Sequence, residues 1–132
     1  MAKIGPQGKL NMDFRFTKEQ ESFRSEVRAF LVDNLGQDWQ GVVPDDYFTD
    51  ENWTLIRGLT GKLVDKGWLT LAWPTEYGGQ DRPHIEQMIY NEETAYFRAP
   101  MRDTSMGTHM VGPSIMMYGS DKQKDQYLSE IA

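Results

Sequence analysis

The sequence contains no cysteine among its 132 residues. This absence excludes disulfides, thiolate nucleophiles, iron–sulfur clusters and cysteine-ligated zinc. No apolar run approaches the roughly 20 residues of a membrane-spanning helix, so no membrane span is predicted. Positive charge is also in the minority, since 14 lysines and arginines stand against 20 aspartates and glutamates. The net charge of −6 argues against a general nucleic-acid-binding surface, which would need a basic face.

The N-terminal residues lack both a targeting signal and a helical pattern. Residues 1–8 have no apolar core and no small-residue cleavage site, so they do not resemble a secretory signal, and we expect a cytoplasmic protein. Residues 1–11 show no apolar periodicity. We therefore predict a mobile leader over residues 1–11, with Met12 as a candidate original start after an added or natural extension, and a domain over residues 12–132.

Five stretches show the apolar spacing or the end signals of a helix. The first has Thr17 as its N-cap, Gln20 at the reciprocal capping-box position and Gly36 as its stop. The last begins in the same way, with Ser120 and Gln123. The pattern predicts an all-α bundle of about five helices. The predicted helices cover, in chain order, residues 17–35, 49–66, 81–99, 104–118 and 120–131.

The connector between the second and third predicted helices, residues 67–79, is rich in aromatic side chains. Pro74 fixes one backbone angle, and the Gly78-Gly79 pair permits left-handed angles. Trp68 and Trp73 offer large apolar surfaces that need something to pack on. The stretch between these two tryptophans is the only short extended candidate. We therefore predict a fixed, partly buried connector that acts as scaffold and sets the angle between two helices.

The fourth predicted helix, residues 104–118, is rich in methionine. Pro113 lies inside it, so we expect a helix that is kinked or restarted there. Methionines at helical spacing usually form core, but these adaptable side chains also line sites for long apolar ligands. Both interpretations stay open on the residues alone. The methionines concerned are Met106, Met110, Met116 and Met117.

The ionisable residues that attract attention favour structural roles. Glu92 and Glu93 are adjacent, and adjacent helical residues point about 100° apart, so they cannot both face one substrate. We expect one to be exposed and the other to tie down a neighbouring loop. Neither His84 nor His109 has a glutamate three positions before it, so no metal site is predicted. We expect His84 at the surface and His109 either satisfied or facing solvent.

Short motifs follow one another in a distinctive order. Glu-Tyr-Gly-Gly at residues 76–79 precedes the paired glutamates, and Gly-x-x-x-Gln-Lys follows at residues 119–124. In this order the chain resembles the N-terminal helical domain of the acyl-CoA dehydrogenase family, over nearly everything from Met12 onward. The resemblance rests on residues 12–14, 17–20, 27–31, 63–68, 73–79, 91–93, 110–113, 118–124, 127–128 and 131–132.

The resemblance implies an FAD-dependent enzyme that removes two hydrogens across the α–β bond of an acyl-CoA thioester. In that family a carboxylate abstracts the α proton, the flavin accepts the β hydride, and an electron-transfer protein takes the electrons. A β domain and a C-terminal helical bundle follow the helical domain and, with a partner subunit, supply most flavin contacts and usually the base. The chain is thus expected to be inactive alone, to hold no FAD, to carry no catalytic residue and to self-associate through faces that those parts would cover.

The resemblance also places substrate contacts on the methionine-rich helix. That helix lines one side of the acyl pocket in the family, and we expect Met106 and Met110 to face the acyl chain. Arg102 and Asp103, at the deep end of the pocket, are weaker candidates. The connector and the Met-Val-Gly-Pro segment most resemble bacterial members acting on long, branched or cyclic acyl groups, including steroid side chains. The matched substrate-binding residues are Met106, Gly107, Met110 and Val111.

Two alternatives come from other functional classes. In the first, the chain is a free-standing helical module used for protein interaction or for assembly with a separately encoded dehydrogenase subunit. In the second, it is a small carrier that holds acyl chains on its methionine face. The DNA beyond codon 132 separates truncation from a module, because an in-frame Thr-Glu-Pro-Gly type segment supports truncation and a native stop codon supports a module. Binding of acyl-CoA by the isolated chain tests the carrier.

Overall fold

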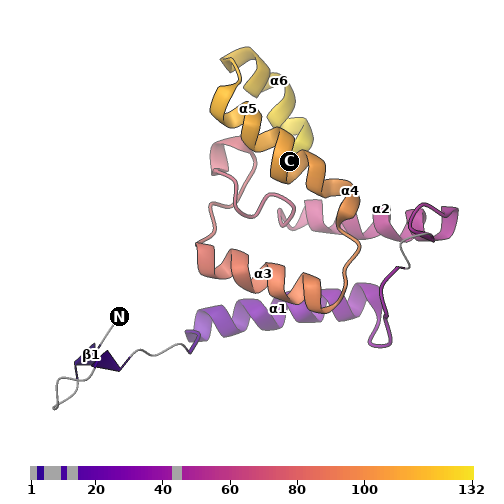
Figure 1. The fold of residues 1–132 in the computed structure, drawn as a ribbon, viewed down its shortest axis with the longest axis vertical. Coiled ribbons are helices and arrows are strands. Elements are labelled where there is room, and N and C mark those ends of the chain that lie inside the picture. Colours follow the sequence, from indigo (N-terminus) through magenta and orange to yellow (C-terminus); the bar gives the residue numbers. More distant parts are fainter. Residues whose placement is uncertain (1–2, 5–9, 12–14, 43–45) are drawn as a thin grey trace.

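The computed structural model describes residues 3–4, 10–11, 15–42 and 46–132. Helices dominate the described part, which confirms the all-α fold (Figure 1). The elements after the N-terminal segment are α1 (Lys18–Leu35), α2 (Asp50–Asp65), the 3-10 helix η2 (Thr75–Tyr77), α3 (His84–Tyr96), α4 (Arg102–Ser105), the π-helix η3 (Met106–Val111), α5 (Gly112–Tyr118) and α6 (Asp121–Ile131). Among the described helices, none is both long and apolar enough to cross a membrane.

Two very short strands precede the helices. β1 (Lys3–Ile4) pairs antiparallel with β2 (Leu10–Asn11), in a register that sets Lys3 opposite Asn11. No sequence signal predicted this pairing, which lies within the expected leader. The extended candidate between Trp68 and Trp73 forms turns instead of a strand. Residues 12–14, which the resemblance also used, lie outside the described part.

The two capping boxes predicted from the sequence are confirmed. The Thr17 hydroxyl accepts a hydrogen bond from the Gln20 backbone N–H at 3.3 Å, and the Gln20 side chain accepts one from the Thr17 N–H at 2.9 Å. Ser120 and Gln123 repeat this exchange at the start of α6. α1 ends where expected, at Gly36 with φ 86°. Local hydrogen bonding therefore fixes the first and last helices of the bundle.

The ends of α2 and α3 share one C-terminal device. After α2, the Trp68 N–H bonds to the Leu63 carbonyl at 2.9 Å around Gly67 at φ 65°. After α3, the Ala99 N–H bonds to the Thr94 carbonyl at 2.9 Å around Arg98 at φ 48°. Both are Schellman-type closures with the pivot residue in the left-handed region. The left-handed Arg98 explains why α3 stops at Tyr96, ahead of the predicted stop at Pro100.

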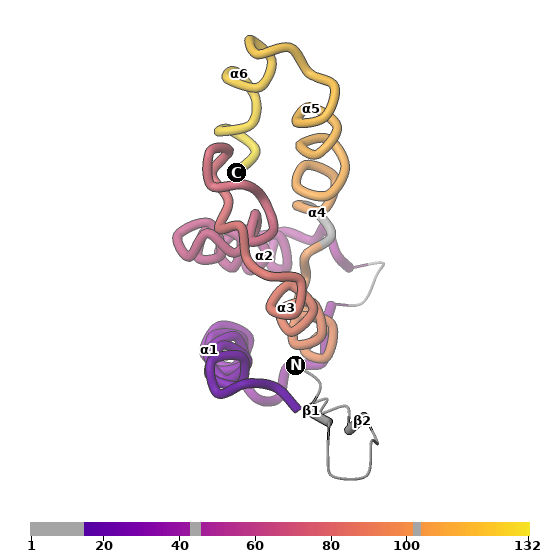
Figure 2. Tube along the Cα trace, turned by 90° about the vertical axis from the view of Figure 1, so that its left-hand side faces the viewer, coloured from indigo at the N-terminus to yellow at the C-terminus, as the bar shows by residue number. Residues whose placement is uncertain are grey.

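A core forms where α1 lies along α3, with α2 and the connector beside them (Figure 2). The glycines inside α2 play no part in it, because a Cβ added to Gly58 or Gly61 would meet nothing within 4 Å. They are tolerated at the surface and mark no close backbone contact. The buried members of the core are Phe23, Val27, Leu31, Leu59, Leu63, Trp68, Leu71, Ile89 and Tyr90.

The other end of the molecule consists of α6 and a continuous helical rod made of α4, η3 and α5 (Figure 1). We refer to residues 102–118 as the rod. Pro113 stands in the first turn of α5, directly after the π-helical segment. The irregularity expected at Pro113 is thus a stretch of wider helix before the proline.

Candidate functional site

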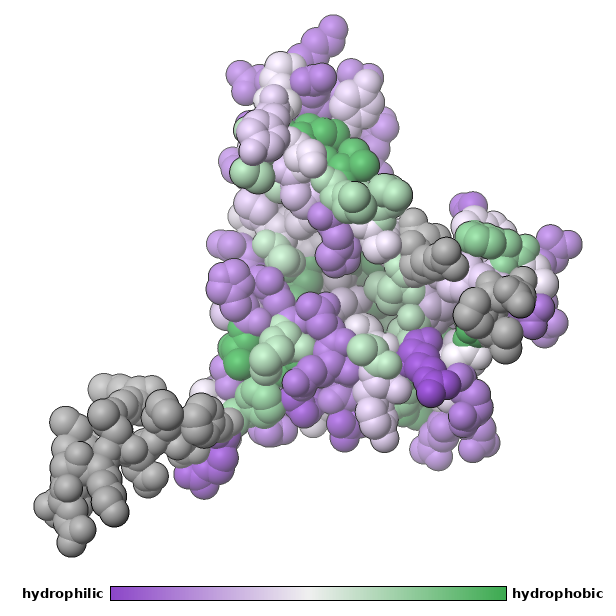
Figure 3. All heavy atoms as spheres, in the orientation of Figure 1, coloured by the Kyte–Doolittle hydropathy of each residue, from purple (hydrophilic) through white to green (hydrophobic). Residues whose placement is uncertain are grey.

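A shallow groove runs along the rod beside the start of α6. Met106, Met110 and Val111 line it, as do residues of α5 and the turn after it, and its volume is about 480 Å³. Met106 and Met110 are each 60% exposed. Figure 3 shows hydrophobic surface gathered over this part of the molecule. We call it the methionine groove, and its lining residues are Met106, Met110, Val111, Ser114, Ile115, Tyr118, Gly119 and Gln123.

The structure brings three of the four predicted substrate-binding residues together. The fourth, Gly107, lies against α6, since a Cβ added to it would sit 3.3 Å from Ile131 Cγ2. Its lack of a side chain lets the rod and α6 approach closely. The side chains of Arg102 and Asp103 lie outside the described part of the structure.

Sequence reasoning missed five groove residues. Ser114 and Tyr118 follow Met110 at intervals of four, and Ile115 follows Val111 in the same way, so helical spacing could have found them. Gly119 and Gln123 had already been assigned to the end of one helix and the cap of the next. Their position in the groove depends on how α6 folds back against α5, which no local pattern predicted.

The connector holds the rod in place through one hydrogen bond. Within η3 the Gly112 N–H donates to the Gly107 carbonyl, five residues back, and Pro113 has no N–H to donate. The Thr108 carbonyl therefore lacks its usual helical donors. Trp73 replaces them, because its indole Nε1–H donates to the Thr108 carbonyl at 2.9 Å.

The rod and Trp73 also fit closely in shape. A Cβ added to Gly112 would lie 2.2 Å from two carbons of the Trp73 ring. Glycine is thus required at this position for the indole to reach the π-helical turn. The Trp73 carbonyl in turn accepts the Asp81 N–H at 2.9 Å, which closes the connector on itself.

The predicted fixed, partly buried connector agrees with these contacts. Trp68 and Trp73 are only 3% and 5% exposed. The Trp68 ring meets the rings of Phe23, Phe30 and Tyr90 at centroid distances of 5.9, 5.2 and 6.0 Å. The connector is therefore a structural element that anchors on the core and positions the rod.

The paired glutamates act between two helices, which corrects the expectation of a tethered loop. The buried Glu93 carboxylate accepts hydrogen bonds from Arg28 Nε and Nη2 at 3.0 and 2.9 Å. Glu92 is largely exposed and accepts one from Arg24 at 2.7 Å. Both arginines belong to α1, whose position in space the α3 sequence alone could not indicate. Donating hydrogen bonds to Glu93 also raises the pKa of Arg28 above its ordinary value.

A second hollow lies between α3, the connector and the side of the rod turned away from the methionine groove. Its volume is about 280 Å³, and Trp68, Trp73 and Tyr90 form part of its wall. Burial raises the pKa of the Tyr90 phenol above its ordinary value of 10. Its hydroxyl has no hydrogen-bond partner among the described residues. We call this hollow the Tyr90 cavity.

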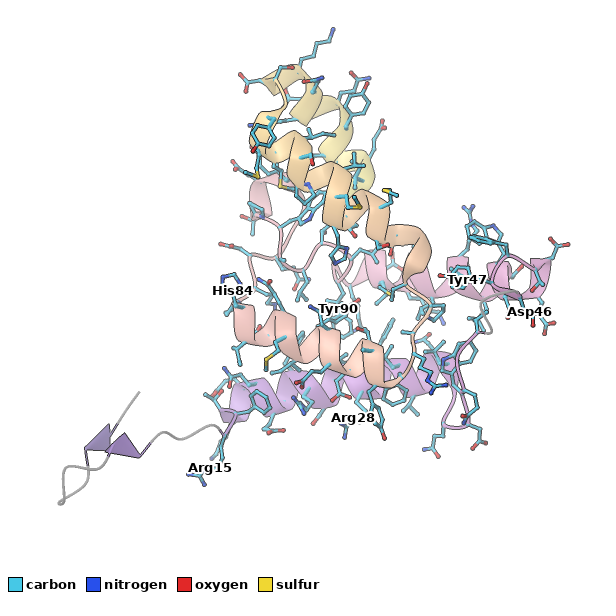
Figure 4. All side chains as sticks on the ribbon, viewed as in Figure 1. Arg15, Arg28, Asp46, Tyr47, His84 and Tyr90 are labelled. Atoms are coloured by element: carbon cyan, nitrogen blue, oxygen red, sulfur yellow. The ribbon has the colours of Figure 1, made fainter. Side chains whose placement is uncertain are left out.

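The two histidines occupy the positions expected for them. His84 is exposed at the first turn of α3 (Figure 4). His109 is exposed as well, and its Nδ1 lies 2.9 Å from the Thr108 hydroxyl. Among the described residues, no group of three or more aspartates, glutamates or histidines could hold a metal ion.

Most of the chain matches a known protein family. Residues 17–132 match the model described as "Acyl-CoA dehydrogenase, N-terminal domain". Among curated relatives, the acyl-CoA dehydrogenase FadE26 of Mycobacterium tuberculosis is 31% identical over 121 residues. That match covers 92% of this chain and 30% of the relative. The acyl-CoA dehydrogenase IpdE1 of Mycolicibacterium smegmatis is 30% identical, with 86% of this chain and 29% of the relative covered.

Solved structures show the same fold. The ChsE4-ChsE5 complex from Mycobacterium tuberculosis contains a chain with a TM-score of 0.72 and 31% identity, matched over 91% of this chain and 29% of that one. The structure described as "Tcur3481-Tcur3483 steroid ACAD" gives a TM-score of 0.67 at 30% identity, over 91% of this chain and 30% of that one. This chain thus spans about 30% of the length of the relatives that it matches. The chain belongs to the acyl-CoA dehydrogenase family, of which it forms an N-terminal domain.

Proposed function

We propose that this chain is the N-terminal part of a flavin-dependent acyl-CoA dehydrogenase, in which the methionine groove forms one wall of the acyl pocket. The observation that carries the proposal is the exposure of Met106 and Met110 in a groove whose described lining residues are all uncharged. Hydrocarbon is the natural ligand of such a surface, because thioether and methyl groups give dispersion contacts without a polar group to desolvate.

The four predicted substrate-binding residues then have defined roles. Met106 and Met110 contact the acyl chain, Val111 extends the wall, and Gly107 lets α6 support the rod from the other side. FAD in the whole enzyme supplies the acceptor for the hydride that leaves the β carbon. Among the described residues, the linings of the methionine groove and the Tyr90 cavity include no lysine or arginine that could pair with the diphosphate of FAD. We therefore assign no FAD contact, catalytic base or reaction step to this chain, and we propose that the chain alone is inactive.

We further propose a bulky cyclic or branched acyl group as the substrate and a second dehydrogenase subunit as a partner. The support for the substrate class is the likeness to a structure described as a steroid acyl-CoA dehydrogenase. The support for the partner is that one matched structure is described as the ChsE4-ChsE5 complex and that the description of another joins two protein names, Tcur3481-Tcur3483. We also propose that the whole enzyme passes its electrons to an electron-transfer protein and that it is located in the cytoplasm.

Charge placed in the methionine groove tests the acyl-pocket role. In the longest natural protein that contains this chain, Met110→Asp should lower kcat/KM for a hydrophobic acyl-CoA by at least about tenfold, because an unpaired carboxylate would be buried against hydrocarbon. The control is Met117→Asp, on the same rod but outside the groove lining and 71% exposed. Oxidation of the acyl-CoA with an artificial electron acceptor measures both variants. Equal activity of Met110→Asp and the unaltered enzyme would remove the acyl-pocket role.

Two measurements on the 132-residue chain alone address the remaining alternatives. The purified chain should show no flavin absorbance, and a stoichiometric yellow cofactor would contradict the assignment of FAD to other parts of the enzyme. Saturable binding of acyl-CoA that is lost in both Met106→Asp and Met110→Asp would favour the carrier instead. A native stop codon after codon 132 would favour the assembly module.

A further inference from the structure

The wide turn formed by η3 decides which side chains share the methionine groove. Met106 and Ile115 are nine residues apart, and on a regular α-helix this separation sets two side chains about 180° apart, on opposite faces. Both side chains nevertheless line the methionine groove. The rod must therefore depart from regular α-helical geometry between these two positions.

The π-helical segment supplies that departure. The Gly112 N–H bonds to the carbonyl five residues back, whereas an α-helical N–H bonds four residues back, so a single wide turn takes up one extra residue. With one residue absorbed, the angle between Met106 and Ile115 falls to about 80°. The angle between Met106 and Tyr118 falls in the same way, from about 120° to about 20°. The wide turn thus brings both ends of the groove toward one face of the rod.

The wide turn lacks one of its own hydrogen-bond donors. In π-helical geometry the N–H of residue 113 would bond to the Thr108 carbonyl, five residues back, but Pro113 has no N–H. The Trp73 indole N–H takes that place in a buried hydrogen bond of 2.9 Å. Trp73 therefore completes the wide turn from a connector that lies 35 residues earlier in the chain.

The aligned groove suits a long ligand. Met106 and Tyr118 are 12 residues apart, which corresponds to about 18 Å along the rod. A butanoyl group would reach only one end of such a groove, whereas a tetradecanoyl chain or a steroid skeleton can lie along most of it. Without the wide turn, the same side chains would form two shorter patches on different faces of the rod.

From this geometry we propose that Trp73 is a positioning residue for the acyl wall. By holding the Thr108 carbonyl it maintains the wide turn, and the wide turn aligns the groove for a long or multi-ring acyl group. Trp73 acts from the opposite side of the rod, because it lines the Tyr90 cavity and is not among the described lining residues of the groove. This inference rests on the proposed function of the groove.

Removing the indole donor tests the inference in the longest natural protein that contains this chain. Two esters serve as probes, tetradecanoyl-CoA and cholanoyl-CoA, whose acyl group carries a steroid skeleton. Trp73→Phe should raise KM for the ester that the enzyme oxidises by at least about fivefold, because several methylene groups lose their contact with the groove. The kcat should change by less than about twofold, since the wall takes no part in bond breaking.

A matched control and a rescue separate the lost donor from a general disturbance. Trp68→Phe changes the other buried tryptophan of the connector, which belongs to the core, and should leave KM within about twofold of the unaltered enzyme. Pro113→Ala adds a backbone N–H five residues beyond Thr108. The double variant Trp73→Phe/Pro113→Ala should therefore regain a KM within about twofold of the unaltered value, also where Trp73→Phe alone is too unstable to assay.

The outcomes distinguish this inference from the proposed function. An unaltered KM in Trp73→Phe, or a double variant that stays as impaired as Trp73→Phe, would overturn the positioning role even where Met110→Asp still abolishes activity. An equal rise in KM in Trp68→Phe would overturn it as well. If the unaltered enzyme oxidises neither ester, the proposed function fails, and this inference fails with it.

Discussion

The half of the molecule that holds α1, α2 and α3 contains nearly all of the buried apolar core, whereas most large apolar side chains of the rod and α6 lie at the surface. Trp68, Ile89 and their neighbours around α1 are at most 8% exposed. In the rod and α6, Met106, Met110, Val111, Met117, Tyr118 and Tyr127 are all more than 40% exposed. Leu128 is the only described apolar side chain of that half in the buried core.

This difference separates two uses of apolar residues. In the first half they stabilise the fold, because their surface is removed from water within the chain. In the second half they offer a surface for contact with something else, since exposed apolar patches commonly mark binding or assembly sites. The methionines of the rod belong to the second class, so their place on a helix does not make them core.

The largest expected effect comes from truncating one large apolar side chain in each half. Trp68→Ala should lower the free energy of unfolding by about 3–5 kcal/mol, because it leaves a cavity among three other aromatic rings. Met110→Ala, at a side chain that is 60% exposed, should change it by no more than about 0.5 kcal/mol. Urea unfolding followed by circular dichroism measures both. A similar loss in both variants would mean that the methionine groove is core after all.

A pair of glycine substitutions tests how the halves are joined. Gly112→Ala should cost about 1–3 kcal/mol, because the new Cβ would collide with the Trp73 ring at 2.2 Å. Gly61→Ala, in α2 with nothing within 4 Å, should instead stabilise the chain by up to about 1 kcal/mol. Thermal unfolding of the two variants in parallel would give opposite shifts in Tm. Shifts of the same sign would contradict the close fit between Trp73 and the rod.

The glutamate pair sharpens the comparison within the first half. Glu93→Gln should cost about 1–2 kcal/mol, because one amide oxygen cannot replace a carboxylate that accepts two bonds from Arg28. The cost is limited because the Arg28 side chain is 54% exposed, so that water screens its charge. Glu92→Gln, at an exposed position, should cost less than about 0.5 kcal/mol. If urea unfolding ranks the two in the reverse order, the buried glutamate does not hold α1 to α3.

The smallest expected effect appears at high pH. Burial raises the pKa of Tyr90, so the unfolded chain loses this phenol proton from about pH 10 while the folded chain keeps it. Stability from this group is therefore complete below pH 10 and falls as the pH rises further, by about 1 kcal/mol at pH 11. Tyr90→Phe should show a correspondingly shallower loss between pH 9 and pH 11 in urea unfolding. Identical slopes would mean that Tyr90 ionises as easily in the folded chain as in the unfolded one.

Features set by neighbouring residues were predictable from the sequence. The capping boxes at Thr17 and Ser120, the stop at Gly36 and the apolar stripe of α1 depend on side chains within about two turns of helix. The motif order sufficed to place the chain in its family. The aromatic connector was also correctly interpreted as scaffold, since its tryptophans needed buried partners.

Features that join distant segments were not predictable in the same way. The Trp73 to Thr108 hydrogen bond spans 35 residues, and the bonds from α1 to Glu93 span 65. Pro113 correctly predicted an irregular helix. The widened turn before it also depends on the Trp73 indole N–H, a hydrogen-bond donor from the connector. Gly107 faces α6 because α6 folds back against the rod. No local sequence pattern indicates this fold-back, so the sequence could not show on which side of the rod Gly107 lies.

The Trp73 indole proton offers a direct reading of how firmly the two halves hold together. Bonded to the Thr108 carbonyl and buried, it can exchange with deuterium only when the connector and the rod separate. The ratio of its exchange rate to that of a free indole gives the free energy needed to separate the connector from the rod. If docking of a partner subunit on the exposed face stiffens the rod, this single proton will slow its exchange although it lies away from the contact.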